Sequence, residues 1–376
     1  MKKIFHLILI FTMGLTTMAT TIEFQLKTST DVSDVYITGN LEQLGKWDPS
    51  KIRMKKDNGT FFYKISLDDC SKDIEYKYTL GNWNSVEKDK EFNDVPNHII
   101  KFTELIGKNK FVRTDEINVF GNKDKKIKSS LTGNFDSFLL FNYKIIVYLP
   151  PDYEKNLKKD YPLLIMHDGQ NLFDQATAFG GNEWNCDESA QDLIKRNVIK
   201  PLIIAGIYNR GSKRMIDYTP TFDKNIDAGG KGDVYLDFIV KRLLPYLKLK
   251  FRISDDGLSI GGSSLGGLIS LYSMIKYPDT FKNIMAISPS VWWDDKYILK
   301  NIKKTSSRIW LDIGTLEGDI IKDDVSQACL DARDLYKKMK NIGCDVFYKE
   351  YKGERHNESS WSKRFPEILE FFYKRK

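Results

Sequence analysis

The chain has 376 residues, of which 41% are hydrophobic and 13% aromatic, so it carries enough apolar material for about two packed domains. Its formal net charge is +7, but the lysines are scattered and most stand beside acidic residues, which argues against a nucleic-acid-binding protein. The densest basic stretch, at 121–130, is typical of a solvated linker.

Residues 1–20 have the pattern of a signal peptide. A short basic start, "MKK", precedes the apolar stretch "IFHLILIFTMGL", and the small residues of "TTMAT" follow, so we expect cleavage near Ala19. The apolar stretch is too short to span a bilayer comfortably, although an uncleaved anchor is an alternative. We therefore expect an exported protein, periplasmic or extracellular, without stable membrane insertion after cleavage.

The four cysteines give no sign of a metal site. Cys70, Cys186, Cys329 and Cys344 include no CxxC pair, so a structural zinc site is not expected. An exported chain can pair cysteines, and four of them allow three full connectivities, among which the sequence does not choose. The preferred interpretation is that they are small buried apolar side chains.

Residues 21–102 carry the signature of an all-β domain. Apolar and polar residues alternate in segments rich in β-branched and aromatic types, namely "TIEFQLKT", "SDVYITGN", "GTFFYKISL" and "DIEYKYTLG". This pattern predicts a small immunoglobulin-like β-sandwich with turns between short strands. The lysine-rich residues 103–133 lose the alternation and are expected to form a linker.

Residues 134–376 have the pattern of an α/β domain. Short, nearly unbroken apolar runs predict strands buried on both faces, as in "YKIIVYLP", "YPLLIMHDG", "PLIIAGIYN", "FKNIMAISPS" and "SRIWLDIG". Helical patterns lie between them, including "DESAQDLIKRN", "DVYLDFIVKRLLPYLKLKF" and "ACLDARDLYKKMKNIG". The alternation predicts a mostly parallel sheet covered by helices on both faces.

The segment "SIGGSSLGGLISLY" (259–272) fits the G-x-S-x-G pattern when it is centred on Ser264, between Gly262 and Gly266. Centring on Ser263 fails, because Leu265 stands where a glycine is needed. A strand before the serine and a helix after it would form the sharp turn that exposes a nucleophile. A structural glycine loop is the alternative, and phosphate-loop spacings are absent from the segment.

A serine nucleophile needs a general base, and the chain has four histidines. His6 lies in the signal peptide and His98 in the β region, whereas His167 precedes the serine. His356 follows it, in a loop between the strand-like "DVFYKEY" and the last helical pattern. The chain order of α/β-hydrolases, serine then acid then histidine, therefore favours His356.

The acid is expected in or after the strand of "SRIWLDIGTLEGD", which offers Asp312, Glu317 and Asp319. Spacing slightly favours Glu317, and a solvated acidic turn is the alternative. The oxyanion would need backbone N–H donors. We expect these from Leu265, directly after the nucleophile, and from Gln170, in the loop after an early strand.

Four motifs in order, "HDGQNLFD", "GGSSLGG", "GTLEGD" and "GERHNESSW", resemble the putative-esterase family of α/β-hydrolases over about residues 134–374. The resemblance implies Ser264 as nucleophile, His356 as base and Glu317 as acid, where several relatives carry aspartate. It also implies that Arg214, in "RMIDYTP", lies on the substrate side. Members of the family need neither a metal nor an organic cofactor.

The N-terminal region resembles a starch-binding carbohydrate-binding module in "VYITGNLEQLGKWDPS", "IEYKYTLGNW" and "VEKDKEFNDVPNHII". The resemblance implies that Trp47, Lys77 and Asn97 bind an α-glucan. The position of a second binding tryptophan holds Lys88, with Trp83 close by as a substitute. The alternative is a sandwich that only supports the catalytic domain, with Trp47 in its core.

Other tryptophans follow the predicted strand ends near the site. Trp292 and Trp293 in "SPSVWWDD" are candidates for stacking on a substrate ring, and Trp184 and Trp361 are candidates for the pocket wall. In each case an ordinary core position is an equal alternative.

The pattern as a whole predicts an exported serine esterase without metal or cofactor, acting on esters on or linked to carbohydrate. A tethered sugar-binding module would raise the local substrate concentration. The alternatives are an acyltransferase to a sugar hydroxyl, a siderophore esterase of the enterobactin type, and a non-catalytic glucan-binding protein.

Overall fold

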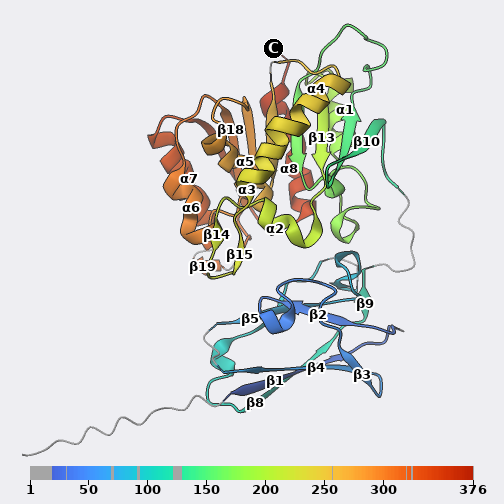
Figure 1. Cartoon of the computed structure of the whole chain (residues 1–376), viewed down its shortest axis with the longest axis vertical. Helices are drawn as coiled ribbons and strands as arrows, with labels where there is room; N and C mark the ends of the chain where they lie inside the picture. Colours follow the sequence, from blue (N-terminus) through green and yellow to red (C-terminus); the bar gives the residue numbers. More distant parts are fainter. Residues whose placement is uncertain are drawn as a thin grey trace, which may run out of the picture. The chain divides into compact units, whose positions relative to one another are not determined.

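The computed structural model describes residues 19–30, 32–68, 72–90, 94–121, 129–255, 257–318, 320–322 and 325–375. The chain forms two compact units, which comprise residues 1–125 and 126–376 (Figure 1). The expected signal peptide covers residues 1–20, of which residues 1–18 lie outside the described residues. Thr20, at its end, is already the first residue of β1. Within the described residues, no helix is both long and apolar enough to cross a membrane.

The N-terminal unit is all-β. Its strands are β1 (Thr20–Lys27), β2 (Tyr36–Gly39), β3 (Lys55–Asp57), β4 (Thr60–Leu67), β5 (Ile74–Thr79), β6 (Glu87–Lys88), β7 (His98–Ile100), β8 (Lys110–Glu116) and β9 (Val119–Phe120). The sheets have the orders β3-β4-β1-β8 and β2-β5-β7, with β6 paired to β9. Phe24 and Phe61 from the first sheet share one core with Ile37 and Tyr76 from the second, so the two sheets pack as a sandwich.

The predicted linker at 103–133 is wrong in its first half. Residues 110–116 form β8, which pairs in parallel with β1 along its length, and residues 119–120 form β9. Strand β8 lies at the edge of its sheet, and only Asp115 of its residues is buried. Its exposed positions include Lys110, Thr114 and Glu116, so the polar sequence of this edge strand resembles a solvated segment.

The C-terminal unit is built on an eight-stranded sheet of order β10-β11-β13-β12-β16-β17-β18-β21 in the described residues. Strands β10 and β11 pair antiparallel, as do β11 and β13, and the remaining neighbours pair in parallel. The strands are β10 (Asn134–Leu140), β11 (Tyr143–Leu149), β12 (Leu163–His167), β13 (Ile203–Ile207), β16 (Ser259–Ser263), β17 (Asn283–Ile287), β18 (Arg308–Gly314) and β21 (Asp345–Tyr351). Two small ladders join β14 (Phe222–Asp223) to β15 (Ala228–Gly229) and β19 (Ile320–Lys322) to β20 (Val325–Ser326).

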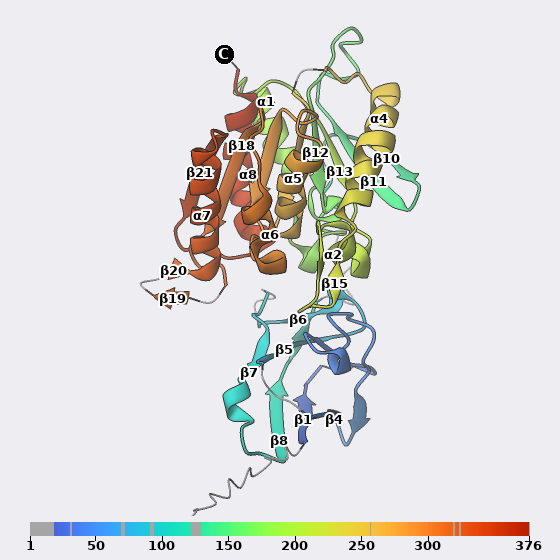
Figure 2. The same cartoon turned by 60° about the vertical axis from the view of Figure 1, so that its left-hand side comes forward.

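Helices cover both faces of this sheet (Figure 2). They are α1 (Cys186–Lys195), α2 (Arg214–Asp217), α3 (Gly232–Phe238), α4 (Leu244–Lys250), α5 (Leu265–Lys276), α6 (Trp293–Asn301), α7 (Gln327–Asn341) and α8 (Glu358–Tyr373). A π-helical segment, Ile239–Leu243, joins α3 to α4. Along β11, Val147 packs into the core beneath α3–α7, whereas Tyr148 packs into the core beneath α1 and α8. The inner strands of the sheet, from β11 to β18 in the sheet order, are therefore buried on both faces, as their apolar runs predict, whereas the edge strands β10 and β21 are largely exposed or half-buried.

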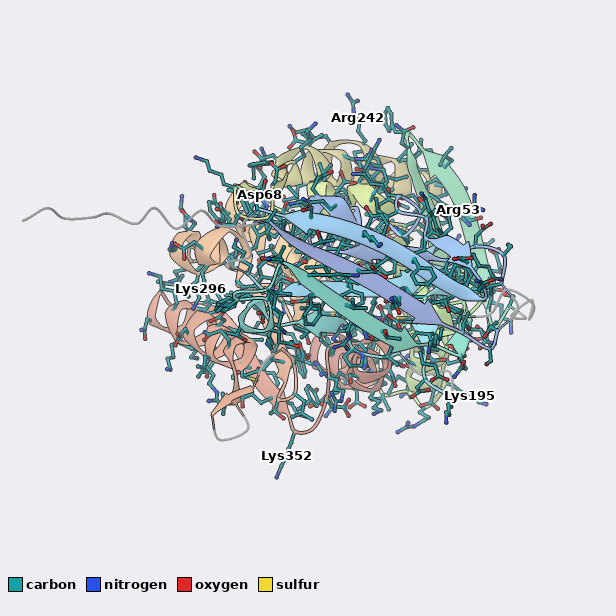
Figure 3. The ribbon with its side chains drawn as sticks, turned by 90° about the horizontal axis from the view of Figure 1, so that it is seen from below. Arg53, Asp68, Lys195, Arg242, Lys296 and Lys352 are labelled. Carbon is teal, nitrogen blue, oxygen red and sulfur yellow. The ribbon has the colours of Figure 1, made fainter. Side chains whose placement is uncertain are left out.

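The cysteines that the structure describes are buried, as the sequence predicts, and charged side chains lie on the surface. Cys186, Cys329 and Cys344 are buried and free, while Cys70 lies outside the described residues. Figure 3 shows Lys195, Arg242 and Lys352 at separate places around the molecule rather than in one stripe.

Candidate active site

Ser264 occupies the turn between β16 and α5. Its φ of 58° and ψ of −123° are unusual for a residue with a side chain, so the surrounding structure must hold the turn in place. The Ser264 amide donates to the Ile287 carbonyl at 3.0 Å, and its carbonyl accepts from the Ser290 amide at 3.1 Å. Ser264 is partly exposed, whereas Ser263 is buried at the end of the strand.

The two glycines of the motif pack closely against His167 and leave little room for a side chain. A Cβ atom at Gly262 would lie 3.1 Å from His167 Cβ, and one at Gly266 would lie 3.3 Å from the same atom. His167 itself is fully enclosed, and its Nδ1 lies 2.9 Å from the Tyr235 hydroxyl. Burial lowers the pKa of His167 to about 3, so it stays neutral beneath the turn and is no rival to His356.

His356 links the serine to a carboxylate. Its Nε2 lies 2.9 Å from Ser264 Oγ and its Nδ1 lies 2.8 Å from Glu317 Oε2. The loop after β21 carries His356, and Trp361 packs edge-on against the imidazole with ring centroids 4.9 Å apart. The structure thus brings the three residues together in the order that a serine hydrolase would need.

Glu317 is held by donors on its second oxygen. Oε1 accepts from Ser288 Oγ at 2.6 Å, from the Gly314 amide at 2.7 Å and from Arg364 Nη2 at 3.2 Å. Burial alone would raise the pKa of Glu317, but the hydrogen bond and charge of His356, together with Ser288 and Arg364, hold it below its ordinary value. The carboxylate is therefore ionised and fixed opposite the imidazole.

Of the other two candidate acids, Asp312 and Asp319, the structure describes only Asp312, which is not seen in contact with the histidine. Asp312 is buried, and its carboxylate accepts from Trp310 Nε1 at 2.7 Å and from Arg364 Nη1 at 2.9 Å rather than from the histidine. Burial raises the pKa of Asp312 to about 6, although the charge of Arg364 opposes the rise. Asp319 lies outside the described residues.

Ser288, Ser290 and Arg364 surround these contacts, and none of them was expected from the sequence to belong to the site. Arg364 Nη1 donates to Ser288 Oγ at 2.9 Å, and Ser290 Oγ lies 3.3 Å from Ser264 Oγ. A signal for Arg364 does exist in the sequence, because it falls within the apolar stripe of α8. A charged residue in such a stripe indicates a buried partner.

The expected oxyanion donors lie in two tight turns. Leu265 is the first residue of α5, where the amide has no partner within the helix. Gln170 lies in a 3₁₀ turn, Gly169–Asn171, directly after β12. A Cβ atom at Gly169 would lie 2.6 Å from the Gly206 carbonyl carbon, so only glycine fits beside Gln170.

Arg214 takes part in holding the Gln170 loop. Its Nε and Nη2 donate to the two oxygens of Asp168 at 2.8 and 2.7 Å, and Asn209 Nδ2 donates to the same carboxylate at 2.7 Å. Burial raises the pKa of Asp168, but the charge and hydrogen bonds of Arg214 outweigh it and lower the pKa overall. The expected substrate-side residue is thus engaged with the protein, with about a quarter of its side chain (27%) exposed.

The tryptophans divide between surface and core. Trp292 is 48% exposed, two residues beyond Ser290, and keeps an accessible ring. Trp293 is fully buried, with Nε1 donating to the Thr221 carbonyl at 3.1 Å, so the expectation that it stacks on a substrate is wrong. Trp184, a candidate for the pocket wall, is also buried at 3% exposure and packs in the core, which was the alternative for this position.

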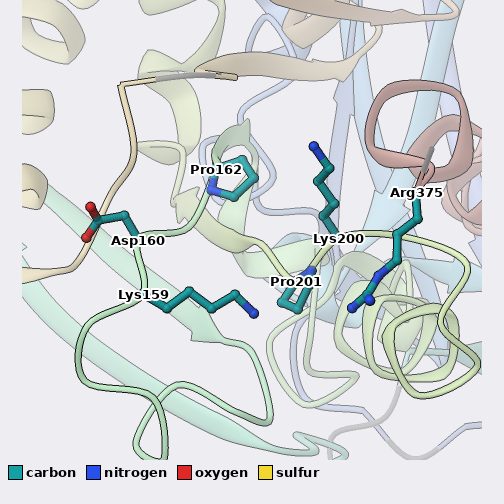
Figure 4. Close-up of a pocket in the computed structure, with 6 residues that line it drawn as sticks. All are labelled: Lys159, Asp160, Pro162, Lys200, Pro201 and Arg375. Carbon is teal, nitrogen blue, oxygen red and sulfur yellow. The ribbon is translucent and has the colours of Figure 1, made fainter.

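A hollow of about 400 Å³ lies elsewhere on this unit (Figure 4). Lys159, Asp160, Pro162, Lys200, Pro201 and Arg375 line it. Pro162 and Pro201 precede the amino ends of β12 and β13, whereas Ser264 follows the carboxyl end of β16. The hollow therefore belongs to the opposite edge of the sheet and is separate from the serine.

In the N-terminal unit, the residues expected to bind glucan are partly exposed. The Trp47 amide donates to Gly39 at the end of β2, and Gly39 pairs with Tyr76, next to Lys77. Lys77 Nζ donates to the carbonyls of Val95 and Pro96, and Asn97 Nδ2 donates to Glu75 at 2.8 Å. These contacts gather Trp47, Lys77 and Asn97 around one part of the β2-β5-β7 sheet.

The position expected to hold a second binding tryptophan carries a buried, ion-paired lysine instead. Lys88 is buried and pairs with Asp94 at 2.6 Å. Trp83 lies in a short 3₁₀ turn after β5 and is partly exposed.

Comparison with known proteins follows the division into two units. A family model described as "Putative esterase" matches residues 139–372, and a model described as "Starch binding domain" matches residues 19–110. An uncharacterized Bacillus subtilis protein, YbbA, is 25% identical over 65% of this chain and 97% of its own length. A siderophore triacetylfusarinine C esterase of Aspergillus fumigatus is 31% identical over 45% of this chain and 60% of its own length.

Solved structures extend the likeness in fold. The enterobactin esterase FES of Shigella flexneri aligns with a TM-score of 0.52 at 13% identity, covering 93% of this chain and 92% of the esterase. Together with the family match over most of the C-terminal unit, this likeness indicates an α/β-hydrolase fold that follows an all-β domain in the sequence. The chain therefore belongs to the putative-esterase family and carries an N-terminal starch-binding domain.

Proposed function

We propose that the protein is a serine esterase in which Ser264, His356 and Glu317 act together. The observation that carries the proposal is the pair of contacts on one imidazole, 2.9 Å to the serine oxygen and 2.8 Å to a buried carboxylate. In this arrangement the carboxylate orients the ring and stabilises its protonated form.

In the proposed reaction, Ser264 Oγ forms a bond to the ester carbonyl carbon while its proton passes to His356 Nε2. The amides of Leu265 and Gln170 would stabilise the negative charge on the tetrahedral oxygen. When the C–O bond to the alcohol breaks, the alcohol takes the proton from His356. Water then attacks the acyl-enzyme by the same route and releases the acid.

We further propose that the preferred ester is on or attached to a carbohydrate. The match to a starch-binding domain supports this substrate class, because a tethered binding module concentrates the enzyme on its substrate. The partly exposed ring of Trp292 supports it as well, since an aromatic face near the serine suits a sugar or aryl ring. In this view the protein acts outside the cytoplasm, as the first twenty residues of its sequence suggest.

A siderophore ester is a second candidate. The support is the likeness to the siderophore esterase of Aspergillus fumigatus, at 31% identity over 179 residues. Hydrolysis of a catecholate trilactone would use the same serine and would need no glucan. A substrate panel that includes acetylated or feruloylated glycans and a catecholate trilactone separates the two candidates by kcat/KM.

The mechanism is tested with Ser264→Ala, using Ser263→Ala as the matched control. Hydrolysis of p-nitrophenyl acetate should fall by on the order of 10³-fold or more in Ser264→Ala and remain near wild type in Ser263→Ala. Glu317→Gln should also lose most of kcat. Retained activity in Ser264→Ala would reject the nucleophile, and an inactive wild type on every ester would reject the enzyme.

A further inference from the structure

Three carboxylates gather where the loop before α1 enters the helix. Glu183 lies in the loop, and Asp187 and Glu188 lie in the first turn of α1. One oxygen from each residue lies within 4.8 Å of those from the other two. Three like charges this close together in a poorly solvated place repel strongly unless a cation or protons neutralise them.

Some oxygens of this cluster accept hydrogen bonds from the protein, whereas the others have no partner. Glu183 Oε1 accepts from Ser130 Oγ at 2.5 Å, and Asp187 Oδ2 accepts from the amide and hydroxyl of Thr132 at 2.7 and 2.8 Å. The remaining oxygens, Glu183 Oε2, Asp187 Oδ1 and Glu188 Oε2, are buried without a hydrogen-bond partner. None of the ion pairs among the described residues includes these carboxylates.

An oxygen outside the acidic cluster is also unpaired. Tyr148, on β11 beneath α1, is fully buried, and its hydroxyl has no hydrogen-bond partner. Burial raises the pKa of Tyr148, and the charge of Asp187 raises it further, so the hydroxyl lies within the field of the cluster. A buried hydroxyl without a partner is unfavourable, and a cation bound through the lone pair of its oxygen would offset part of that penalty.

We propose that Glu183, Asp187 and Glu188 bind one Ca²⁺ ion near the unpartnered Tyr148 hydroxyl. The donor set consists of hard oxygens, which Ca²⁺ prefers and zinc does not. Ca²⁺ binds oxygen at about 2.3–2.6 Å, so two ligands on opposite sides of the ion lie up to about 5 Å apart, in keeping with the spacing of the cluster. Mg²⁺ is smaller and spans only about 4 Å.

A shared proton is the competing way to neutralise the cluster. Burial raises the pKa of Glu188 to about 7, and its contact with Asp187 adds to the rise. Ca²⁺ would displace that proton and leave all three groups ionised. The two possibilities differ in whether added Ca²⁺ stabilises the protein.

The proposed ion has a structural role in the esterase unit. Ser130 and Thr132 bring the first residues of the unit onto the cluster. The Trp184 amide, one residue beyond Glu183, donates to the Asn171 carbonyl at 2.9 Å, next to Gln170. The ion would therefore fasten the entry segment of the unit and the loop of the proposed oxyanion donor, without taking part in ester chemistry.

The experiment uses the full chain, stripped of metal by a chelator and dialysed. CaCl₂ is titrated by calorimetry, and the melting temperature is measured with and without 1 mM CaCl₂. The test variant is Glu183→Gln with Glu188→Gln, which keeps the shape of both side chains. The matched control is Asp192→Asn, an exposed carboxylate on the same helix that pairs with Arg196.

We expect one Ca²⁺ per chain and a rise in melting temperature of about 3–10 °C in the wild type and in Asp192→Asn, with no rise in the double variant. No binding by the wild type, or an equal rise in the double variant, would overturn the site. A wild type whose melting temperature does not respond to Ca²⁺, beside a double variant that is more stable than that wild type, would also overturn the site, in favour of a shared proton. Should the double variant fail to fold, Tb³⁺ luminescence decides: Trp184 and Tyr148 should sensitise it in the wild type, and Ca²⁺ should compete it away. Absence of that signal rejects the proposal.

Discussion

Arg364 and Glu317 form a buried ion pair directly behind the histidine, with Nη2 3.2 Å from Oε1 and both side chains 1% exposed. The same guanidinium also holds Asp312, at 2.9 Å. One cation thus serves two buried carboxylates, of which one contacts His356 and the other does not.

Replacing this cation should cost much of the stability of the esterase unit. Arg364→Met leaves Glu317 and Asp312 buried without their charge partner, and we expect a loss of about 3–5 kcal/mol in the free energy of unfolding. Equilibrium unfolding in guanidinium chloride measures this loss. Arg333→Met is the control, because the Arg333–Glu350 pair is nearer the surface and its loss should cost about 1 kcal/mol or less. Equal losses in both variants would contradict the buried-pair argument.

The pH dependence of stability should reveal Asp312. Its pKa of about 6 in the folded protein lies above its ordinary value, so the folded state holds a proton that the unfolded chain loses between about pH 4 and pH 6. The contribution of this group therefore favours folding at low pH and is lost as the pH rises through that range. In Asp312→Asn this loss is absent, so unfolding measured from pH 4 to pH 7 should show the variant improving relative to wild type as the pH rises. A constant difference would contradict the raised pKa.

Gly169→Ala should damage catalysis through the backbone. The new methyl group would lie 2.6 Å from the Gly206 carbonyl carbon, so the loop must move and carry the Gln170 amide with it. We expect kcat to fall by about 10²-fold or more, because an oxyanion donor loses its place, with a smaller change in KM. Steady-state kinetics on p-nitrophenyl acetate checks the expectation, and unchanged kcat would remove Gln170 from the proposed oxyanion site.

Trp47→Ala should weaken glucan binding by the N-terminal unit. Loss of one partly exposed aromatic face should reduce retention on insoluble starch by about tenfold. Trp292→Ala, in the other unit, serves as the control and should bind starch like the wild type. A wild type that is not retained would favour a supporting role for the sandwich.

The sequence was most informative where a local pattern demands one geometry. The apolar runs predicted the buried strands, and the glycine spacing distinguished Ser264 from its neighbour because only one serine can stand in the turn. The scarcity of histidine then singled out His356. In each case the signal is contained in a few adjacent residues or in a very small set of candidates.

Contacts between distant residues could not be predicted in this way. Ser288 and Arg364 hydrogen-bond to Glu317 across sequence separations of 29 and 47 residues, and no periodic pattern in the sequence predicts such contacts. Trp293 and Trp292 are adjacent and identical in type, so only tertiary packing decides that one is buried. Strand β8 was missed because an edge strand exposes the charged side chains that also mark a linker.

The packing of Gly262 and Gly266 against one imidazole makes these three positions interdependent in evolution. A Cβ atom at either glycine would press on His167 at 3.1–3.3 Å, so a larger residue there requires His167 to give way by a few tenths of an ångström. A smaller residue at 167 would remove the ring part of this contact together with the support of the turn. Substitutions there should be strongly epistatic, harmful singly and partly compensating in pairs. The side chain that fills the space under Ser264 therefore restricts which sequences can keep a serine on this turn, although it touches no substrate in the proposed reaction.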